Sequence, residues 1–254
     1  MSGQARIIPT LLLRGTGFYK TTKFKQPVYL GDPMNILRIF NEKEVDEIAI
    51  LDIDATPEGR GPHFDVLQDM ASECFMPLAY GGGVSDVAHV KRLLKIGFEK
   101  VVINSAAHAR PELITEISST SGSQSVVCAI DVKRTLFGGY EVVCRSAKQS
   151  TKWKPEEWAR EVESRGAGEI LVNAVDRDGT LSGYDLDLVG RVAKAVGVPV
   201  IASGGARNVD DFRQAVKDSH ASACAAGAMF VFQGRHRAVL INVPSPSELR
   251  RALA

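Results

Sequence analysis

The chain has 254 residues and a formal net charge of +1, and its residues are 44% hydrophobic and 24% charged. This length is usual for one α/β barrel, and the composition is that of a soluble globular protein with a large core. So small a net charge excludes an overall field that draws the chain to nucleic acid or to an anionic membrane. A bound anion must therefore be held by local geometry.

The cysteines and the N-terminal segment indicate the cytoplasm as the compartment. The four cysteines show no C-x-x-C spacing, and three lie in apolar runs, which favours free thiols over a disulfide framework or a zinc site. The apolar run near the N-terminus has no basic start and is too short to span a bilayer. The histidines lack metal-ligand spacing and no dinucleotide fingerprint is present, so we expect neither a metal nor a cofactor.

Short apolar runs rich in β-formers alternate along the chain with longer segments of helical pattern. Runs that are apolar throughout are typical of a parallel sheet covered on both faces. Of the helical segments, Pro155–Arg165 opens with proline and acidic residues, which is a good helix start, and Leu186–Val196 is a second example. The predicted strands are Arg6–Leu13, Glu47–Asp52, Pro77–Tyr80, Lys100–Asn104, Ser125–Asp131, Glu169–Ala174, Val198–Ala202 and Ala221–Ala226.

One interruption follows the fifth predicted strand. The residues LFGGYEVVCR place Gly138 and Gly139 between β-rich flanks, which predicts a hairpin that lengthens the loop after Asp131. No linker rich in serine or proline divides the chain, so we expect a single domain over residues 1–254.

The chain also resembles itself. The segment MPLAYGGGVSDV, which begins at Met76, matches VPVIASGGARNV, which begins at Val198, and IPTLLLRG around Leu12 matches VCAIDVKR around Asp131. An open doubly wound sheet would also alternate strands and helices. Eight strands in two similar halves instead favour the α/β class and a (β/α)₈ TIM barrel, built from half-barrels of about residues 1–122 and 123–254.

Glycine and polar residues recur where the predicted strands end, at the face where barrels of this kind hold their active sites. Glycines between a strand and a helix let backbone N–H groups approach an anion, and they stand at matching places in both halves. Plain turns would explain one such pair, but two copies fit a ligand with a phosphate at each end. The candidate phosphate-binding residues are Gly82, Gly83, Asn104, Ser105, Gly204, Gly205, Gly227 and Ala228.

Asp131 closes the fifth strand after a wholly apolar stretch, so it is a candidate general base with a raised pKa. The alternative is a structural carboxylate that pairs with Lys133 or caps a loop. In AVDRDGTLSG, we expect Asp176, Gly179 and Thr180 to contact the substrate or to shape its loop.

With these residues in place, the chain resembles the cyclase subunit of imidazole glycerol phosphate synthase. The matching stretches run from about Arg6 to Phe232 and include RIIP, DEIAILDID, PLAYGGGV, KVVINSAA, DRDGTLSGYDLDL and VPVIASGGA. The resemblance implies a barrel of two halves that receives ammonia from a glutaminase partner in a heterodimer. It also implies a substrate with two phosphates, a formimino-ribulosyl nucleotide that is split and cyclised to imidazole glycerol phosphate.

The same resemblance implies roles for single residues. Asp131 falls on one of the family's two catalytic aspartates, and Lys20 falls on the lysine of its mobile first loop. A ring of charges that gates ammonia at the far end of the family's barrels also has its counterparts in this chain. Salt bridges at strand starts would explain the same residues structurally. The ring residues are Arg6, Glu47, Lys100 and Glu169.

The pattern of the family breaks in the first strand, where Leu12 stands in the place of the other catalytic aspartate. A leucine cannot donate or accept a proton, and the loss of one acid–base group costs about 10²–10⁴ in rate. A leucine-rich first strand, followed by a loop like KTTKFKQPVYLGDP from Lys20, resembles a branch of the family associated with surface-polysaccharide gene clusters. That branch resembles ammonia suppliers for amidination of a sugar's acetamido group, acting with a glutaminase and a separate sugar amidotransferase that uses ATP.

Three functions therefore stay open. The first is ammonia supply for sugar amidination, which Leu12 and the first loop favour. The second is the histidine-pathway cyclase, which Asp131, Lys20 and both phosphate sites favour. The third is a catalytically silent barrel that activates a glutaminase. The sister isomerase of the histidine pathway would need an aspartate at Leu12 and no ammonia gate.

Overall fold

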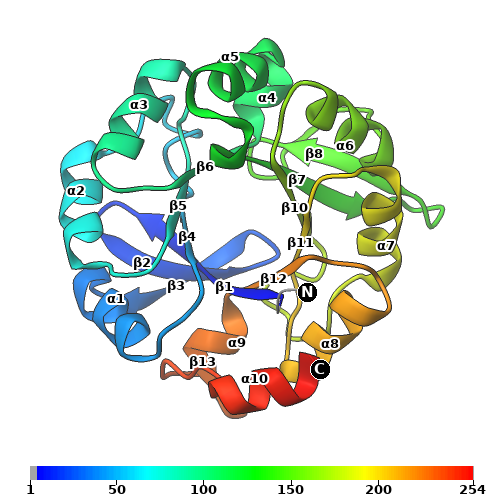
Figure 1. Cartoon of the computed structure of the whole chain (residues 1–254). Coiled ribbons are helices and arrows are strands. Elements are labelled where there is room, and N and C mark those ends of the chain that lie inside the picture. The colour runs from blue at the N-terminus through cyan, green and yellow to red at the C-terminus, as the bar shows by residue number, and fades with distance from the viewer. Residues whose placement is uncertain (1–4, 254) are drawn as a thin grey trace.

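Eight parallel strands form a closed barrel in the structure, a computed structural model that describes residues 5–253 (Figure 1). β1 pairs with β12 on one side and β4 on the other, and β7 pairs with β10, so the sheet closes on itself. This confirms the predicted α/β barrel. The barrel strands are β1 (Arg6–Arg14), β4 (Ile48–Asp52), β5 (Leu78–Gly81), β6 (Lys100–Ile103), β7 (Val126–Arg134), β10 (Glu169–Ala174), β11 (Val200–Ser203) and β12 (Ala223–Ala226).

Helices alternate with these strands and surround the barrel (Figure 1). Asp86 and Asp185 cap α3 and α7 by accepting a backbone N–H, and Asn208 forms a capping box with Asp211 in α8. None of the helices formed by residues 5–253 has the length and apolar character needed to cross a membrane. The helices are α1 (Pro33–Glu42), α2 (Phe64–Glu73), α3 (Val87–Lys95), α4 (Ser105–Ala109), α5 (Glu112–Ser121), α6 (Pro155–Ser164), α7 (Leu186–Ala195), α8 (Val209–Lys217), α9 (Ala228–Val231) and α10 (Pro246–Leu253), with a 3₁₀ turn at Ser123–Ser125.

Two antiparallel hairpins extend the barrel strands. β7 continues into β8 (Tyr140–Cys144) and then β9 (Gln149–Ser150), which confirms the predicted hairpin and explains why β7 runs past Asp131 to Arg134. β1 continues in the same way into β2 (Gly17–Thr22) and β3 (Lys25–Gly31), a hairpin that the sequence did not reveal. A small ribbon of β13 (Phe232–Gln233) and β14 (Ala238–Val239) lies outside the barrel.

Hydrophobic side chains form two buried layers. The outer layer lies between the strands and the helices and includes Leu37, Trp158 and Phe212, all almost fully buried. The inner layer fills the barrel, because alternate residues of each strand point inward. This inner layer is narrow and rich in alanine, and it consists of Ile8, Ala49, Ala79, Val102, Val127, Ala129, Leu171, Ile201, Ala223 and Ala225.

Candidate active site at the mouth of the barrel

The C-terminal ends of the barrel strands open into a cavity of about 750 Å³. This is the face where the sequence placed the candidate site, because every parallel strand delivers its last inward residue there. The cavity is lined by residues at the strand ends and in the segments that follow them, among them Leu12, Asp52, Gly82, Gly83, Asn104, Ser105, Asp131, Asn173, Gly179, Gly204, Gly205, Gly227 and Ala228.

Asp131 lies deep in this cavity and is only 9% exposed. One carboxylate oxygen accepts a hydrogen bond from Asn104 Nδ2 at 2.7 Å, and the other accepts one from Asn173 Nδ2 at 3.0 Å. Burial raises the pKa of Asp131 to about 6, although the two amide donors oppose this rise. A carboxyl with this pKa can exchange a proton near neutral pH, as a general base requires.

Lys133 does not pair with Asp131, which was the structural alternative. Its Nζ donates instead to the carbonyl oxygen of Ala147, 2.9 Å away in the turn after β8. Asp131 and Lys133 are two residues apart on β7, so strand alternation alone would put them on the same face, and the Ala147 carbonyl is what takes the Lys133 ammonium. The carboxylate of Asp131 is therefore held by uncharged groups alone.

Asn173 was not predicted, although it is the residue opposite Asp131 in the register of β10 with β7. It stands inside the apolar run EILVNA, so its position in the sequence resembles a buried strand residue. The signal that could have found it is alternation from Leu171, which places Asn173 on the inward face.

The other carboxylates of the cavity lining are in ion pairs. Each of them faces a basic side chain that also lines the cavity, so their charges are balanced. Asp131 differs from them because it has no cationic partner among the described residues. The pairs are Asp52 with Arg60 at 2.8 Å, Asp54 with Arg14 at 3.2 Å, and Asp178 with Lys20 at 2.8 Å.

Leu12 is the inward residue near the end of β1, where it faces the cavity and is 8% exposed. It lies beside Leu51 of β4 and Tyr19 of β2 in the sheet. No carboxylate stands at this strand end, so the cavity holds only one member of the aspartate pair that the family resemblance implies.

Lys20 is buried on β2, and its Nζ lies 2.8 and 3.1 Å from the two carboxylate oxygens of Asp178. The family resemblance places this lysine in the first loop, and in the structure it lies on a hydrogen-bonded hairpin strand. Its side chain runs across Gly227, where an added Cβ would lie 3.0 Å from Lys20 Cε. The lysine therefore reaches the second glycine cluster.

The glycines form two close approaches on the lining of the cavity. Gly82 and Gly205 have φ values of 123° and 111°, which residues with a side chain rarely adopt. A Cβ would lie 2.5 Å from the carbonyl oxygen of Asp52 at the first position, and 2.3 Å from that of Gly183 at the second. Both positions thus require glycine, and each leaves bare backbone beside the cavity.

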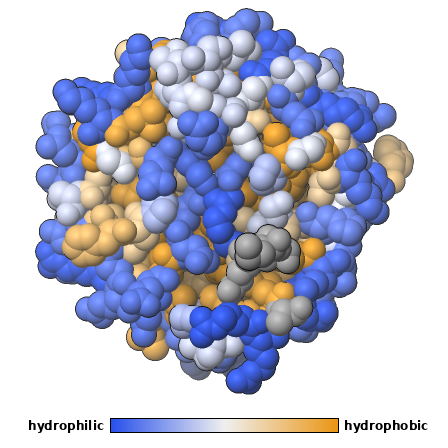
Figure 2. All heavy atoms as spheres, in the orientation of Figure 1, coloured by the Kyte–Doolittle hydropathy of each residue, from blue (hydrophilic) through white to orange (hydrophobic). Residues whose placement is uncertain are grey.

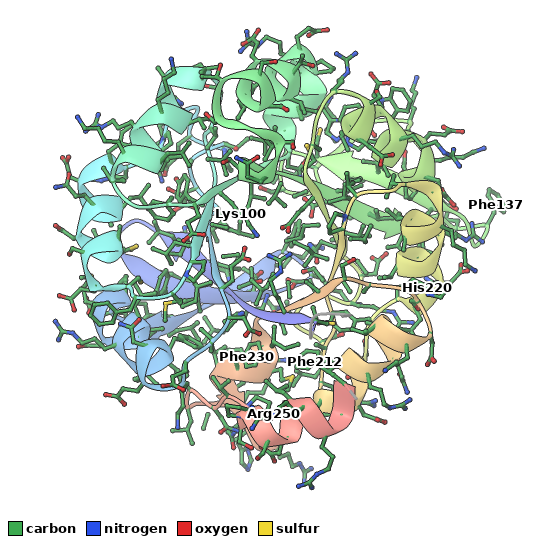
Figure 3. All side chains as sticks on the ribbon, viewed as in Figure 1. Lys100, Phe137, Phe212, His220, Phe230 and Arg250 are labelled. Carbon is green, nitrogen blue, oxygen red and sulfur yellow. The ribbon has the colours of Figure 1, made fainter. Side chains whose placement is uncertain are left out.

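A ring of charges lies at the other end of the barrel, where the strands begin. The Arg6 guanidinium bonds Glu47 and Glu169, and Lys100 Nζ bonds the same two carboxylates at 2.9 and 3.1 Å. Figure 3 labels Lys100 near the barrel axis, and Figure 2 shows hydrophilic residues at the centre of the same view. The four predicted ring residues are therefore brought together as one closed network.

The comparisons with known proteins fit this geometry. The model of a family described as "Histidine biosynthesis protein" matches residues 6–236. "Putative imidazole glycerol phosphate synthase subunit hisF2" of Pseudomonas aeruginosa is 47% identical over 244 residues, which cover 96% of this chain and 97% of that protein. "Imidazole glycerol phosphate synthase subunit HisF" of Thermobifida fusca is 43% identical over 237 residues, covering 91% and 92%. The chain belongs to the HisF family.

A further relative of the HisF family is "Putative imidazole glycerol phosphate synthase subunit hisF3" of Vibrio vulnificus. It is 44% identical over 252 residues, which cover 98% of this chain and 96% of that protein. Membership of the HisF family confirms the resemblance that the strand-end motifs indicated. It also confirms the enzyme class, that of a cyclase-type synthase subunit.

Two residues expected at the ligand of this HisF-family chain do not line the cavity. Asp176 accepts a hydrogen bond from the backbone N–H of Arg134, beneath the β7–β8 hairpin and beside a separate pocket. Thr180 donates to the carbonyl oxygen of Arg177. Both side chains bond loop backbone in the structure, which fits a role in shaping the loop, and their contact with a ligand stays a prediction. Gly179, from the same stretch, does line the cavity.

Proposed function

We propose that this chain receives ammonia from a glutaminase partner, in a heterodimer, and delivers it through the barrel to the cavity. The ring of Arg6, Glu47, Lys100 and Glu169 closes the entrance end, and the inner layer behind it is apolar and rich in alanine. Neutral ammonia crosses an apolar interior at far lower cost than a charged ion does. The ring would admit ammonia when the partner docks and an ion pair opens.

We propose further that the cavity binds a phosphorylated small molecule at two cradles. Gly82, Gly83, Asn104 and Ser105 would hold one phosphate, and the second cluster would hold the other. Backbone N–H groups at positions that require glycine suit this role, because no side chain blocks the approach of an anion. The residues of the second cluster are Gly179, Gly204, Gly205, Gly227 and Ala228.

The proposed biological role is amidination of a surface-polysaccharide sugar, with a separate sugar amidotransferase as a further partner in the cytoplasm. The observation that carries it is Leu12, which faces the cavity where the family's second catalytic aspartate is expected. One carboxylate, Asp131, is left for a cyclisation that uses two. The mouth of the barrel would then serve to release ammonia to an acceptor rather than to cyclise a nucleotide.

The test is turnover of the formimino-ribulosyl nucleotide by the purified chain with saturating ammonium, beside a Leu12→Asp variant. We expect no measurable turnover by the unmodified chain and a gain of at least about 10²-fold with the aspartate. Leu12→Asn is the matched control, because it adds a polar group of similar size without a carboxylate. Brisk turnover by the unmodified chain would overturn the sugar role.

A second candidate is the histidine-pathway cyclase. It is favoured by Asp131, whose pKa of about 6 suits proton transfer, and by Lys20 beside the second glycine cluster. The turnover assay distinguishes it directly from the first.

A third candidate, of another class, is a catalytically silent activator of a glutaminase. The intact charged ring at the strand starts favours it. This function predicts that the rate of glutamine hydrolysis by the glutaminase rises when the chain is added. Substitution of Asp131 should leave that rate unchanged.

A further inference from the structure

Two basic side chains stand at the rim of the cavity without a carboxylate partner. Arg145 and Lys148 lie in the turn between β8 and β9, and both are exposed and line the cavity. Neither forms an ion pair with any residue of the described range 5–253. Each of the other cations of the lining is held in one of the ion pairs described above.

This leaves two unpaired cations at the rim of a cavity in which every carboxylate of the lining except Asp131 is in an ion pair. The remaining carboxylate, Asp131, lies deep and is bonded by Asn104 and Asn173. Arg145 and Lys148 are therefore the cations that a ligand can use, and the ligand that they suit is anionic.

The turn that carries these cations is held in an uncommon conformation. Arg145, Ser146 and Ala147 have φ values of 51°, 56° and 60°, a left-handed run that residues with side chains disfavour. Such a run persists only where the surroundings fix it. Here the Arg145 N–H donates to Ser105 Oγ at 3.0 Å, and Lys133 donates to the carbonyl oxygen of Ala147. The backbone of the turn that carries the two cations is thus held beside Ser105.

Ser105 belongs to the first phosphate cradle under the proposed function, so the two cations adjoin that cradle. A phosphate monoester would fill the cradle alone and leave both cations without a partner. We propose that Arg145 and Lys148 bind the second phosphoryl group of a diphosphate whose first phosphoryl group lies at Gly82 and Gly83. This rests on the proposed function of sugar amidination and deepens it: the ligand is a sugar attached to a diphosphate carrier, which uses the first cradle and these cations and leaves the second glycine cluster to other groups of the ligand.

Binding of inorganic pyrophosphate and of inorganic phosphate, measured by calorimetry on the full chain, tests the subsite. We expect pyrophosphate to bind about tenfold more tightly than phosphate, since charge-assisted hydrogen bonds to two cations are added. The double variant Arg145→Gln/Lys148→Gln should bind pyrophosphate about tenfold more weakly, and its affinity for phosphate should change little. Both side chains are exposed, so the fold is expected to persist, as circular dichroism would verify.

The matched control is Lys23→Gln/Lys25→Gln, which removes the same charge from the turn after β2 and from the first residue of β3. Neither lysine lines the cavity, so pyrophosphate affinity should stay within about twofold at physiological salt, where distant exposed charges are screened. Equal losses in the two double variants would show a general field instead of a subsite. That result, or equal affinity of the unmodified chain for both anions, would overturn the proposal.

Displacement of pyrophosphate identifies the source of the diphosphate. The probes are uridine diphosphate N-acetylglucosamine for a nucleotide carrier and farnesyl diphosphate in detergent micelles for a lipid carrier. Displacement by either one, weakened by Arg145→Gln/Lys148→Gln, supports the proposal and names the carrier; displacement by neither overturns it. The binding assay for pyrophosphate and the turnover assay for the formimino-ribulosyl nucleotide are independent. Turnover of the nucleotide would refute the proposed function, whereas a lack of preference for pyrophosphate would refute only the diphosphate subsite.

Discussion

The two parts of the chain that we propose as half-barrels begin alike and differ at the end of their first strand. β1 continues into an antiparallel hairpin, and β7 does the same. At matching places on these strands stand Leu12 and Asp131, and both side chains face the cavity. Because neither belongs to the two hydrophobic layers that hold the barrel together, the chemistry of one half can change while the barrel stays intact. Fold and function are thus set by different residues of the same strands.

The two hairpins differ as well. The first folds over the cavity, where Lys20 pairs with Asp178 and the Lys23 N–H donates to the carbonyl oxygen of Asp178 at 2.9 Å. The second projects away from the barrel, and Phe137 at its tip is fully exposed (Figure 3). The first hairpin is therefore part of the wall of the site, whereas the second places only its β8–β9 turn there.

The largest expected effect tests the contrast between Leu12 and Asp131. If the turnover gained by Leu12→Asp uses two opposed carboxylates, then adding Asp131→Asn should remove it, a loss of about 10²–10⁴-fold. Single-turnover kinetics with saturating ammonium would measure this. Retained turnover in the Leu12→Asp/Asp131→Asn double variant would mean that another group supplies the proton.

A second prediction concerns the attachment of the first hairpin. Asp178→Ala leaves the buried Lys20 ammonium without its partner, and we expect a loss of about 3–5 kcal/mol in the free energy of unfolding. The control is Asp54→Ala, which removes the partner of the exposed Arg14 and should cost less than about 1 kcal/mol. Urea unfolding measures both. Equal losses would show that the buried pair does not fasten the hairpin.

A third prediction is a dependence of stability on pH that belongs to the second half. Folding raises the pKa of Asp131 from its ordinary 3.8 to about 6, so the folded chain binds more protons than the unfolded chain between these values. The contribution of Asp131 to the free energy of unfolding is complete below about pH 4, and it falls by about 2–3 kcal/mol as the pH rises through about 6. Urea unfolding of the unmodified chain and of Asp131→Asn at several pH values measures how the free energy of unfolding of each depends on pH. The same pH dependence in both proteins would refute the prediction.

Much of the barrel was predictable because its signals repeat locally. Apolar runs and strand-end glycines recur in both halves, and the observed barrel strands start within two residues of those predicted. Asp131 was found from its place after an apolar strand, and the structure brings it into the cavity as expected.

The missed features depend on contacts between distant segments. Asn173 is hidden in an apolar run, and only the register of β10 with β7 places it beside Asp131. The first hairpin turns at Lys23 and Phe24, which have φ values of 52° and 62°. Glycine or asparagine usually signals such a turn, and neither residue stands at these two positions. The ion pair of Lys20 with Asp178 joins residues far apart in the sequence, so no local pattern encodes it.

The smallest expected effect separates the two hairpins by their packing. Phe137 buries no surface, so Phe137→Ser should change the free energy of unfolding by less than about 0.5 kcal/mol. Phe18 of β2 is fully buried, and Phe18→Ala should cost about 3–5 kcal/mol because it leaves a cavity in the core. Urea unfolding of both variants measures the contrast. A loss above about 1 kcal/mol for Phe137→Ser would mean that the tip packs against the chain, and the two hairpins would then differ in chemistry but not in attachment.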